Sequence, residues 1–392
     1  MKSPGICCLL SRLARLATFW GAAAVLLAAC SAPQKATGKT IFFPSPPDEP
    51  RLQYLTSISN SKFTQEGKSA FRLIITGEQE KDTELTIDKP LGIAVHKGVV
   101  YVVDTHRATV LLIDTAKNLF ETIRGNVGPG RLKKPVNLTI GEDGKLYVAD
   151  VGRKEVLIYT AGGDFIRAVG KGLDLKKPVG VEVDQTSIYV LDNASNTIKV
   201  IDKATLELTR EFGQGTSEDD SLWRPYAIAR DAKGALYVTN TGTGKVLKMD
   251  SDGHTLLAFG KLGDGLGQFA RPRGLTVDSE GRIWVVDAAF QNVQIFNETG
   301  RLLLFFGDPG QPPASMNIPA SVAVTREKID YFMKFADPSF EVEQLVFVTN
   351  QSGYDMLTVY GFGHAKQASE KQPLPASSSP AAPAAPPASG KE

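Results

Sequence analysis

A unit of about 45 residues recurs six times in this chain, and this repetition restricts the possible folds more than any other feature. Every copy opens with a proline, and a basic residue precedes that proline in all but the last copy. Successive prolines, from Pro90 to Pro319, lie 45, 43, 47, 47 and 47 residues apart, and a glycine closes each of the first five copies 35 residues after its proline. A constant core joined by segments of variable length is typical of a repeat array.

The copy at residues 271–307 is the clearest, and its pattern predicts a four-stranded antiparallel sheet. Four short runs are apolar or alternate apolar with polar residues: Gly274 to Val277, Ile283 to Val286, Val293 to Phe296 and Leu302 to Phe306. Glycines occupy the connections between runs, where tight turns require a positive φ. One such sheet cannot bury both of its faces alone, so we expect the copies to pack as the blades of a propeller.

The sixth copy departs from this pattern in two places. It carries an insertion at Glu327 to Glu343, and no fourth run follows its third run, Met356 to Val359. We predict that Arg51 to Ile58, upstream of the first copy, supplies the missing outer strand, because a closed ring protects its sheet edges. The expected fold class is all-β: a six-bladed β-propeller of four-stranded antiparallel blades at residues 51–364, closed by this N-terminal strand.

The repeat resembles a known family. Its pattern P-x-G-x-x-V, followed by Y-V-x-D, V-x-x-x and F-G, resembles NHL repeats, and Pro90 to Gly363 as a whole resembles bacterial six-bladed NHL-type propeller lipoproteins. The resemblance implies the propeller fold. It leaves the activity open, because propellers carry binding, scaffolding and enzymatic roles.

The first 29 residues predict a lipoprotein signal peptide, with basic residues, an apolar run from Leu16 to Leu27, and then small residues. Leu27-Ala28-Ala29-Cys30 resembles a bacterial lipobox, which implies that Cys30 is acylated, becomes the first mature residue and anchors the protein to a membrane. An ordinary secretory signal and an uncleaved helix are the alternatives. Ser31 follows the cysteine, and in the resembling enterobacterial system this implies an outer-membrane location facing the periplasm. The other two cysteines would leave with the signal, so no disulfide is expected.

The flanks of the propeller differ from it in composition. Residues 30–50, rich in proline, lysine and small side chains, are predicted to be a flexible tether. Residues 365–392, rich in alanine, proline and serine, are predicted to be a disordered tail. Between Asn60 and Glu84, only Ala70 to Thr76 is apolar enough for a short helix or strand.

The overall charge excludes one class of partner. Without the first 29 residues, 41 basic side chains stand against 43 acidic ones. No nucleic-acid partner is therefore predicted. No pattern in the sequence indicates whether the protein is a monomer or an oligomer.

An Asp or Asn follows the second run of every copy: Asp104, Asp150, Asp192, Asn240, Asp287 and Asn350. A ring of carboxylates for a ligand is one interpretation. We favour a structural role, because Asp and Asn side chains can form hydrogen bonds with backbone groups of the following turn. A residue that recurs in every blade is also usually required for the fold of the blade.

The topology of a four-stranded meander predicts a basic face. The joint that enters the first strand and the turn between the second and third strands lie on the same face. Ten residues are candidates for ligand binding there: Lys89, Lys134, Lys177, Arg224, Arg271, Arg273, His106, Arg107, Arg153 and Lys154. Together they could attract an anionic glycan, a lipid headgroup or an acidic protein. The alternative is that the aliphatic parts of these side chains cover apolar surface while their charged groups remain in water.

Two residues break the apolar pattern of the first run, Glu182 in the third copy and Arg230 in the fourth. The two residues occupy adjacent positions of the repeat, and side chains at adjacent positions of a strand point to opposite faces of its sheet. Consecutive blades can therefore bring Glu182 and Arg230 together. We predict an interblade ion pair between them. A catalytic Glu182 is the alternative.

The insertion of the sixth copy is unusually aromatic. Tyr331, Phe332 and Phe335 are candidates for docking a partner. The insertion could equally fold back onto its own blade.

These patterns together predict a membrane-anchored lipoprotein of the bacterial cell envelope, whose propeller binds or assembles a protein or an anionic glycan. The alternative is a channel-centred enzyme that resembles a lactonase or an amidating lyase. The inner runs offer such an enzyme mainly Glu182 and Asn137, and the four histidines fall at different blade positions. The sequence shows no metal-ligand spacing, nucleophile elbow or phosphate loop, so no metal and no cofactor are predicted.

Overall fold

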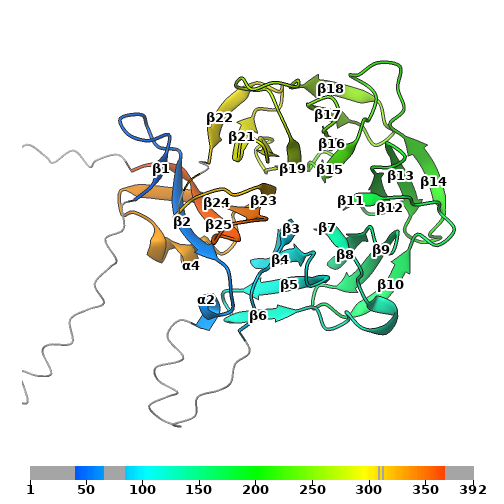
Figure 1. The fold of residues 1–392 in the computed structure, drawn as a ribbon, viewed down its shortest axis with the longest axis horizontal. Helices are drawn as coiled ribbons and strands as arrows, with labels where there is room; N and C mark the ends of the chain where they lie inside the picture. Colours follow the sequence, from blue (N-terminus) through cyan, green and yellow to red (C-terminus); the bar gives the residue numbers. More distant parts are fainter. Residues whose placement is uncertain (1–39, 66–83, 308–309, 311–312, 367–392) are drawn as a thin grey trace, which may run out of the picture. The chain divides into compact units, whose positions relative to one another are not determined.

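The computed structural model describes residues 40–65, 84–307, 310 and 313–366. This part of the chain forms six antiparallel sheets arranged as blades around a central channel, as predicted (Figure 1). No helix in the described part is both long and apolar enough to cross a membrane. The predictions for residues 1–39, for Ala70 to Thr76 and for residues 367–392 fall outside the described residues.

The first five blades each contain four strands, and each blade runs outward from the channel in chain order. Their strands are β3 (Pro90–His96), β4 (Val99–Asp104), β5 (Thr109–Asp114) and β6 (Leu119–Thr122); β7 (Pro135–Ile140), β8 (Lys145–Asp150), β9 (Glu155–Thr160) and β10 (Phe165–Val169); β11 (Pro178–Val183), β12 (Ser187–Asp192), β13 (Thr197–Asp202) and β14 (Leu208–Phe212); β15 (Pro225–Arg230), β16 (Leu236–Asn240), β17 (Lys245–Met249) and β18 (Thr255–Phe259); β19 (Pro272–Val277), β20 (Ile283–Asp287), β21 (Asn292–Phe296) and β22 (Leu302–Phe306).

The sixth blade combines both ends of the described chain. It contains β23 (Pro319–Thr325), β24 (Phe340–Asn350), β25 (Leu357–Ala365) and β2 (Leu52–Ile58). β2 pairs antiparallel with β25, with Leu52 opposite Phe362 and Ile58 opposite Leu357 (Figure 1). The predicted closure of the ring by an N-terminal strand is confirmed.

A short additional strand, β1 (Phe42–Phe43), extends the sixth blade outward by pairing with β2. The Phe42 ring lies 5.6 Å from the ring of Phe340, and the Phe43 ring lies 6.1 Å from that of Tyr360. Burying these two aromatic rings offsets the entropy lost when the segment is ordered. The predicted tether is therefore too long, because its C-terminal part, from β1 onward, belongs to the blade.

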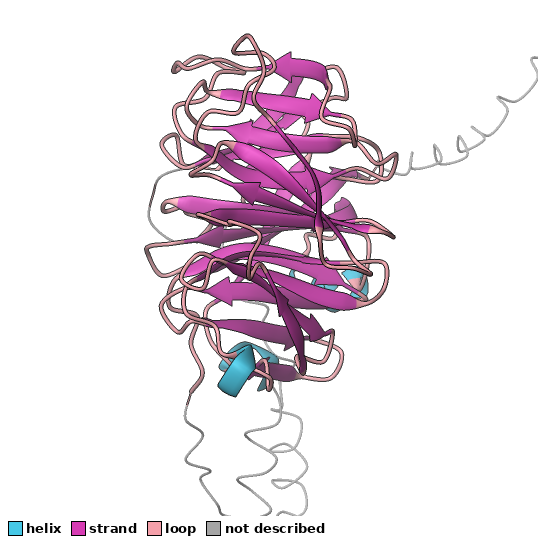
Figure 2. Cartoon of the chain, turned by 90° about the vertical axis from the view of Figure 1, so that its right-hand side faces the viewer, coloured by secondary structure: helices cyan, strands magenta, loops and turns pink. Residues whose placement is uncertain are grey.

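The loops of the blades gather at the two ends of the strands (Figure 2). We call the upper face the one that carries the joints entering the inner strands and the turns between second and third strands. We call the opposite face, with the turns between first and second strands, the lower face.

The inner strands approach one another closely enough to demand glycine. A Cβ atom on Gly274 of β19 would lie only 2.5 Å from the Cα of Ser321 in β23. Likewise, a Cβ atom on Gly92 of β3 would lie 2.7 Å from the Cα of Asn137 in β7. At Gly92 and Gly274, the glycine of the P-x-G pattern therefore permits the close approach of neighbouring inner strands.

Candidate ligand site in the central channel

The Asp or Asn after each second strand organises the upper face. Asp287 is fully buried, and its carboxylate accepts hydrogen bonds from the backbone N–H groups of Ala270 at 2.8 Å and Ala289 at 2.9 Å. Asp104 binds the N–H groups of Asp88 and Arg107 in the same way, at 2.7 and 3.0 Å. The structural role predicted for the Asp or Asn after each second strand is confirmed, because the side-chain oxygens of these residues accept hydrogen bonds from backbone N–H groups.

Backbone hydrogen bonds hold each joint beside its turn. The N–H groups of Thr105, Val151 and Asn193 donate to the carbonyls of Lys89, Lys134 and Lys177, respectively, at 3.0 Å in each case. The residues before the prolines and the turns between second and third strands therefore share the upper face, as the topology predicted.

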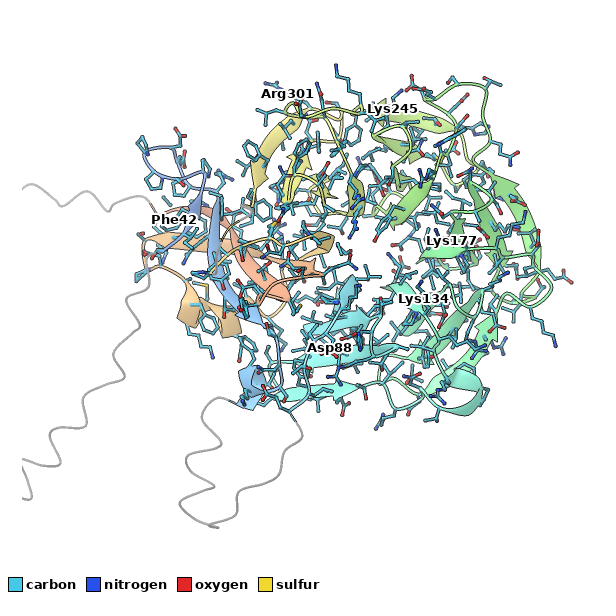
Figure 3. The ribbon with its side chains drawn as sticks, viewed as in Figure 1. Phe42, Asp88, Lys134, Lys177, Lys245 and Arg301 are labelled. Carbon is cyan, nitrogen blue, oxygen red and sulfur yellow. The ribbon has the colours of Figure 1, made fainter. Side chains whose placement is uncertain are left out.

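A pocket of about 170 Å³ opens at the upper mouth of the channel. Two cations from neighbouring blades, Lys134 and Lys177, line it, and both lie nearer the centre of the ring than Lys245 and Arg301 do (Figure 3). The rest of the lining is uncharged: Leu91, Gly92, Val136, Asn137, Val151, Val179, Asn193, Tyr226, Gly274, Ala320 and Ser321. No carboxylate stands among these residues, so the local field favours an anion.

Hydrogen bonds position the polar groups of the mouth. Lys177 Nζ donates to Asn193 Oδ1 at 2.9 Å, and Asn193 Nδ2 donates to the carbonyl of Pro225 in the next blade at 2.7 Å. Lys134 is exposed and makes no side-chain hydrogen bond or ion pair within the described chain. Its ammonium group is thus available to a ligand.

A third cation, Arg273, stands beside the mouth. The guanidinium of Arg273 lies 5.6 Å from the centre of the Tyr226 ring and donates to Gln351 Oε1 at 2.7 Å. Burial raises the pKa of Tyr226, with the charge of Arg273 acting in the opposite direction. The Tyr226 hydroxyl therefore stays protonated at neutral pH and can donate a hydrogen bond.

Two further predicted basic residues form ion pairs within the protein. Arg107 forms an ion pair with Asp88 at 3.1 Å. Arg153 pairs with Glu155 at 2.6 Å and donates to the carbonyl of Pro129 at 2.7 Å. These contacts assign both side chains to the structure of the joints. The remaining candidates lie on the upper face outside the lining of the mouth, and ligand binding by them stays a prediction: Lys89, His106, Lys154, Arg224 and Arg271.

A second chamber of about 180 Å³ lies further along the channel, and Asn137 and Ser321 line both chambers. Glu182 and Arg230 both face this chamber. Glu182 Oε2, in the third blade, accepts a hydrogen bond at 3.1 Å from Thr139 Oγ1 in the neighbouring second blade. In the described contacts the two charged groups make no direct ion pair, so the predicted interblade pair stays a prediction.

Burial raises the pKa of Glu182 to about 8, although the Thr139 hydrogen bond and the charge of Arg230 act in the opposite direction. Near neutral pH this side chain is therefore a carboxylic acid in most molecules. Such a group can give or take a proton in the pH range where proteins work.

The acidic residues of the lower face have a role that the sequence reasoning missed. Asp143 accepts a hydrogen bond from the hydroxyl of Tyr147 at 2.8 Å, and Asp184 accepts one from Tyr189 at 2.8 Å. Burial alone would raise the pKa of Asp143, but hydrogen bonds, first from Tyr147, outweigh it and hold that pKa below its ordinary value. The signal in the sequence is a turn aspartate followed four to six residues later by Tyr or Trp in each of four blades.

The insertion of the sixth blade folds back onto the propeller. Phe332, in α4 (Ile329–Phe332), is only 2% exposed, and its ring lies 5.7 Å from that of Phe347. The Phe63 ring, from α2 (Lys62–Gln65), stacks 6.2 Å from that of Phe335. Partner docking through Phe332 is therefore a wrong prediction. Tyr331 and Phe335 are half-buried against the same cluster.

Histidines and carboxylates do not gather into a metal site in the part of the chain that is described. His254 pairs with Asp250 at 3.0 Å, and His364 pairs with Glu343 at 2.7 Å, each at a different place on the blades.

Comparison with known proteins agrees with this architecture. Residues 269–296 match the family model of the NHL repeat. A structural genomics protein of unknown function from Bacteroides thetaiotaomicron is 17% identical, with 71% of this chain and 70% of that chain covered and a TM-score of 0.53. An auxiliary nutrient binding protein from the same bacterium is 14% identical, with 71% and 70% covered and a TM-score of 0.52.

A gluconolactonase from Xanthomonas campestris is 15% identical, with 83% of this chain and 98% of that chain covered and a TM-score of 0.50. At this level of identity, such similarities establish the fold alone. The protein is a six-bladed β-propeller, and it contains an NHL repeat.

Proposed function

We propose that the protein is a lipid-anchored binding module of the bacterial cell envelope, and that its upper mouth captures an acidic group of a glycan or of a protein. One observation carries the binding proposal: Lys134 and Lys177 line a pocket that contains no carboxylate. Two cations at the rim of a narrow channel raise the local concentration of anions and form charge-assisted hydrogen bonds with them.

The lining of the mouth favours a sugar over a peptide side chain. At about 170 Å³ the pocket is smaller than typical drug-sized sites, so it holds one ring or one acidic group of a longer ligand. The amides of Asn137 and Asn193 offer both donors and acceptors, and the Tyr226 ring offers an apolar face, which together suit a sugar with several hydroxyls. We therefore favour an acidic glycan as the ligand.

Binding can be measured directly by isothermal titration calorimetry with oligogalacturonate, using neutral galactose oligomers for comparison. We expect the variant Lys134→Ala/Lys177→Ala to lose at least about tenfold in affinity, because hydrogen bonds to charged groups contribute about 1.5–3 kcal/mol each. Lys233→Ala on the lower face, where the lysine is 83% exposed at its side chain, is the matched control and should bind as the wild type does. Equal affinity in all three proteins would reject the proposal.

The anchor rests on the sequence Leu27-Ala28-Ala29-Cys30. Growth of cells with a labelled fatty acid should label the wild-type chain, and Cys30→Ser should remove that label. A label that remains on the variant contradicts lipidation at this cysteine. Fractionation of the same cells tests the proposed outer-membrane location.

A second candidate function comes from Glu182. A carboxyl group with a pKa of about 8 inside a channel favours a hydrolase or lyase that uses it as a general acid or base. Assays of the purified protein with lactones test this candidate, with Glu182→Gln as the control. A rate that is the same in both proteins would remove the enzymatic alternative.

A further inference from the structure

The second chamber of the channel holds one cation and one acid. Its volume is about 180 Å³, and residues from all six inner strands line it. Arg230 and Glu182 are the two side chains with a titratable or charged group among these lining residues. The other polar side chains are uncharged: the amide of Asn137 and the hydroxyls of Thr139, Thr276 and Ser321.

The guanidinium of Arg230 lacks a counter-ion at bonding distance. Within the described part of the chain it forms no hydrogen bond and no ion pair. Glu182 shares the chamber with it, but burial raises the pKa of Glu182 to about 8, so this acid is mostly uncharged near neutral pH. Half-buried cations are stabilised by a partner, and the lining of the chamber supplies none that is charged.

Two carboxylates stand near Arg230 outside the chamber, and both are bound to other groups. Asp184 accepts hydrogen bonds from the Tyr189 hydroxyl at 2.8 Å and from the N–H of Ser187 at 2.7 Å. Burial alone would raise the pKa of Asp184, but hydrogen bonds, first from Tyr189, and the charge of Arg230 hold it below its ordinary value. Asp231 accepts from the N–H of Ala235 at 2.9 Å and from the Tyr237 hydroxyl at 3.1 Å.

These groups select a small monoanion with hydroxyls. A guanidinium binds a carboxylate through two parallel hydrogen bonds, and an uncharged carboxylic acid can donate its proton to the same anion. A second negative charge would have no cation in the chamber and would be repelled by Asp184, which disfavours phosphate. The amide of Asn137 and the neighbouring hydroxyls suit the hydroxyl group of a ligand.

We propose that the second chamber binds one small hydroxycarboxylate, with its carboxylate on the guanidinium of Arg230, the carboxylic acid of Glu182 donating to it, and its hydroxyl near Asn137. This site uses neither Lys134 nor Lys177, so the inference goes beyond the proposed function. Asn137 and Ser321 line both chambers, which places the site within reach of the upper mouth.

Binding in this chamber depends on the proton of Glu182, because two carboxylates at one site repel each other. With a pKa of about 8, Glu182 is mostly protonated at pH 7 and mostly ionised at pH 9. The neighbouring Arg230 and Asp184 keep their charges over this range. We therefore expect the affinity for the ligand to fall about tenfold from pH 7 to pH 9.

The test uses the full chain with Lys134→Ala/Lys177→Ala as the parent protein, so that binding at the upper mouth does not contribute. Saturation-transfer NMR should detect saturable binding of glycolate at pH 7, and no binding of glycolamide, which has the same shape without the charge. Arg230→Met should weaken glycolate binding at least about tenfold. The matched control is Arg301→Met, near the outer edge of the ring, which should bind as the parent protein does (Figure 3).

Glu182→Gln tests the proton separately. Its amide keeps N–H donors and cannot ionise, so this variant should bind glycolate equally well at pH 7 and pH 9. The inference is overturned if glycolate does not bind the parent protein, if glycolamide binds as tightly, or if a folded Arg230→Met protein binds as well as Arg301→Met. Should Arg230→Met fail to fold, equal affinity of the parent protein at pH 7 and pH 9 also overturns it. Failure of the proposed function reads out separately, as oligogalacturonate binding that does not depend on Lys134 and Lys177.

Discussion

Thr349 of the sixth blade donates a hydrogen bond from Oγ1 to the backbone carbonyl of Leu91 in the first blade, at 2.7 Å. The same oxygen accepts a hydrogen bond from the N–H of Ser321 at 3.0 Å. Thr349 is fully buried, so no water replaces these bonds if they are lost. One hydroxyl group therefore joins the last blade to the first at the channel.

This contact can be measured against an internal reference. Thr239 of the fourth blade is equally buried and binds the N–H of Ala227 at 3.0 Å, but in the described contacts it has no bond to the next blade. We expect Thr349→Val to lower the free energy of unfolding by about 1 kcal/mol more than Thr239→Val, because only the first change leaves an interblade carbonyl unpaired. Urea denaturation of both variants checks this, and equal losses would assign no stability to the contact.

We expect Asp287 to stabilise the fold mainly because its oxygens accept hydrogen bonds, and less because it is charged. Asp287→Ala leaves buried N–H groups without partners and is expected to cost about 3 kcal/mol or more of unfolding free energy. Asp287→Asn should cost less than half as much, because Asn240 already fills this position in the fourth blade and accepts from the N–H of Trp223. Guanidinium denaturation would contradict the assignment if the two variants were equally destabilised.

Phe332 is expected to behave as a core residue. Phe332→Ala removes a ring that is 2% exposed and should cost about 3–5 kcal/mol of unfolding free energy. The adjacent Met333→Ala, at a position 36% exposed, should change stability by no more than about 0.5 kcal/mol. A Phe332→Ala protein as stable as the wild type would restore the docking interpretation of the insertion.

Glu182 should make stability depend on pH in a defined direction. Its pKa is raised from 4.5 to about 8 in the folded protein, so between these values the folded state holds a proton that the unfolded state has lost. The free energy of unfolding therefore falls as pH rises from about 5 to 8 and levels off above that range.

The comparison with Glu182→Gln isolates this contribution. The amide cannot ionise, so the variant should gain at least about 1 kcal/mol relative to the wild type between pH 5 and pH 8, since one pKa unit corresponds to about 1.4 kcal/mol. Urea midpoints at several pH values provide the measurement. Parallel profiles for the two proteins would show that Glu182 does not titrate in this range.

The architecture was predictable because its signals are local. The prolines of all six copies and the closing glycines of the first five mark the same strand boundaries from blade to blade, so the repetition supported one interpretation. β1 was missed because Phe42 and Phe43 stand among prolines, and only the distant rings of Phe340 and Tyr360 make their burial favourable. The burial of Phe332 depends in the same way on Phe347, a partner that no local pattern identifies.

The channel site was predictable only in part. Topology placed ten basic residues on one face, and Lys134 and Lys177 do line the mouth. Whether a cation is free or paired depends on its neighbours in space. Arg153 is committed to Glu155 and to the carbonyl of Pro129, and the sequence gives no sign of the second contact.

The pairing of β2 with β25 sets the order in which this protein can be completed. Ser59 and Tyr354, 295 residues apart, are joined by a hydrogen bond of 2.6 Å at the end of that pairing. A polypeptide is made from its N-terminus, so β2 waits without its partner until nearly the whole chain has been synthesised. A product that stops short of β25 keeps an open sheet edge, and this exposed edge distinguishes unfinished molecules from finished ones for chaperones and proteases.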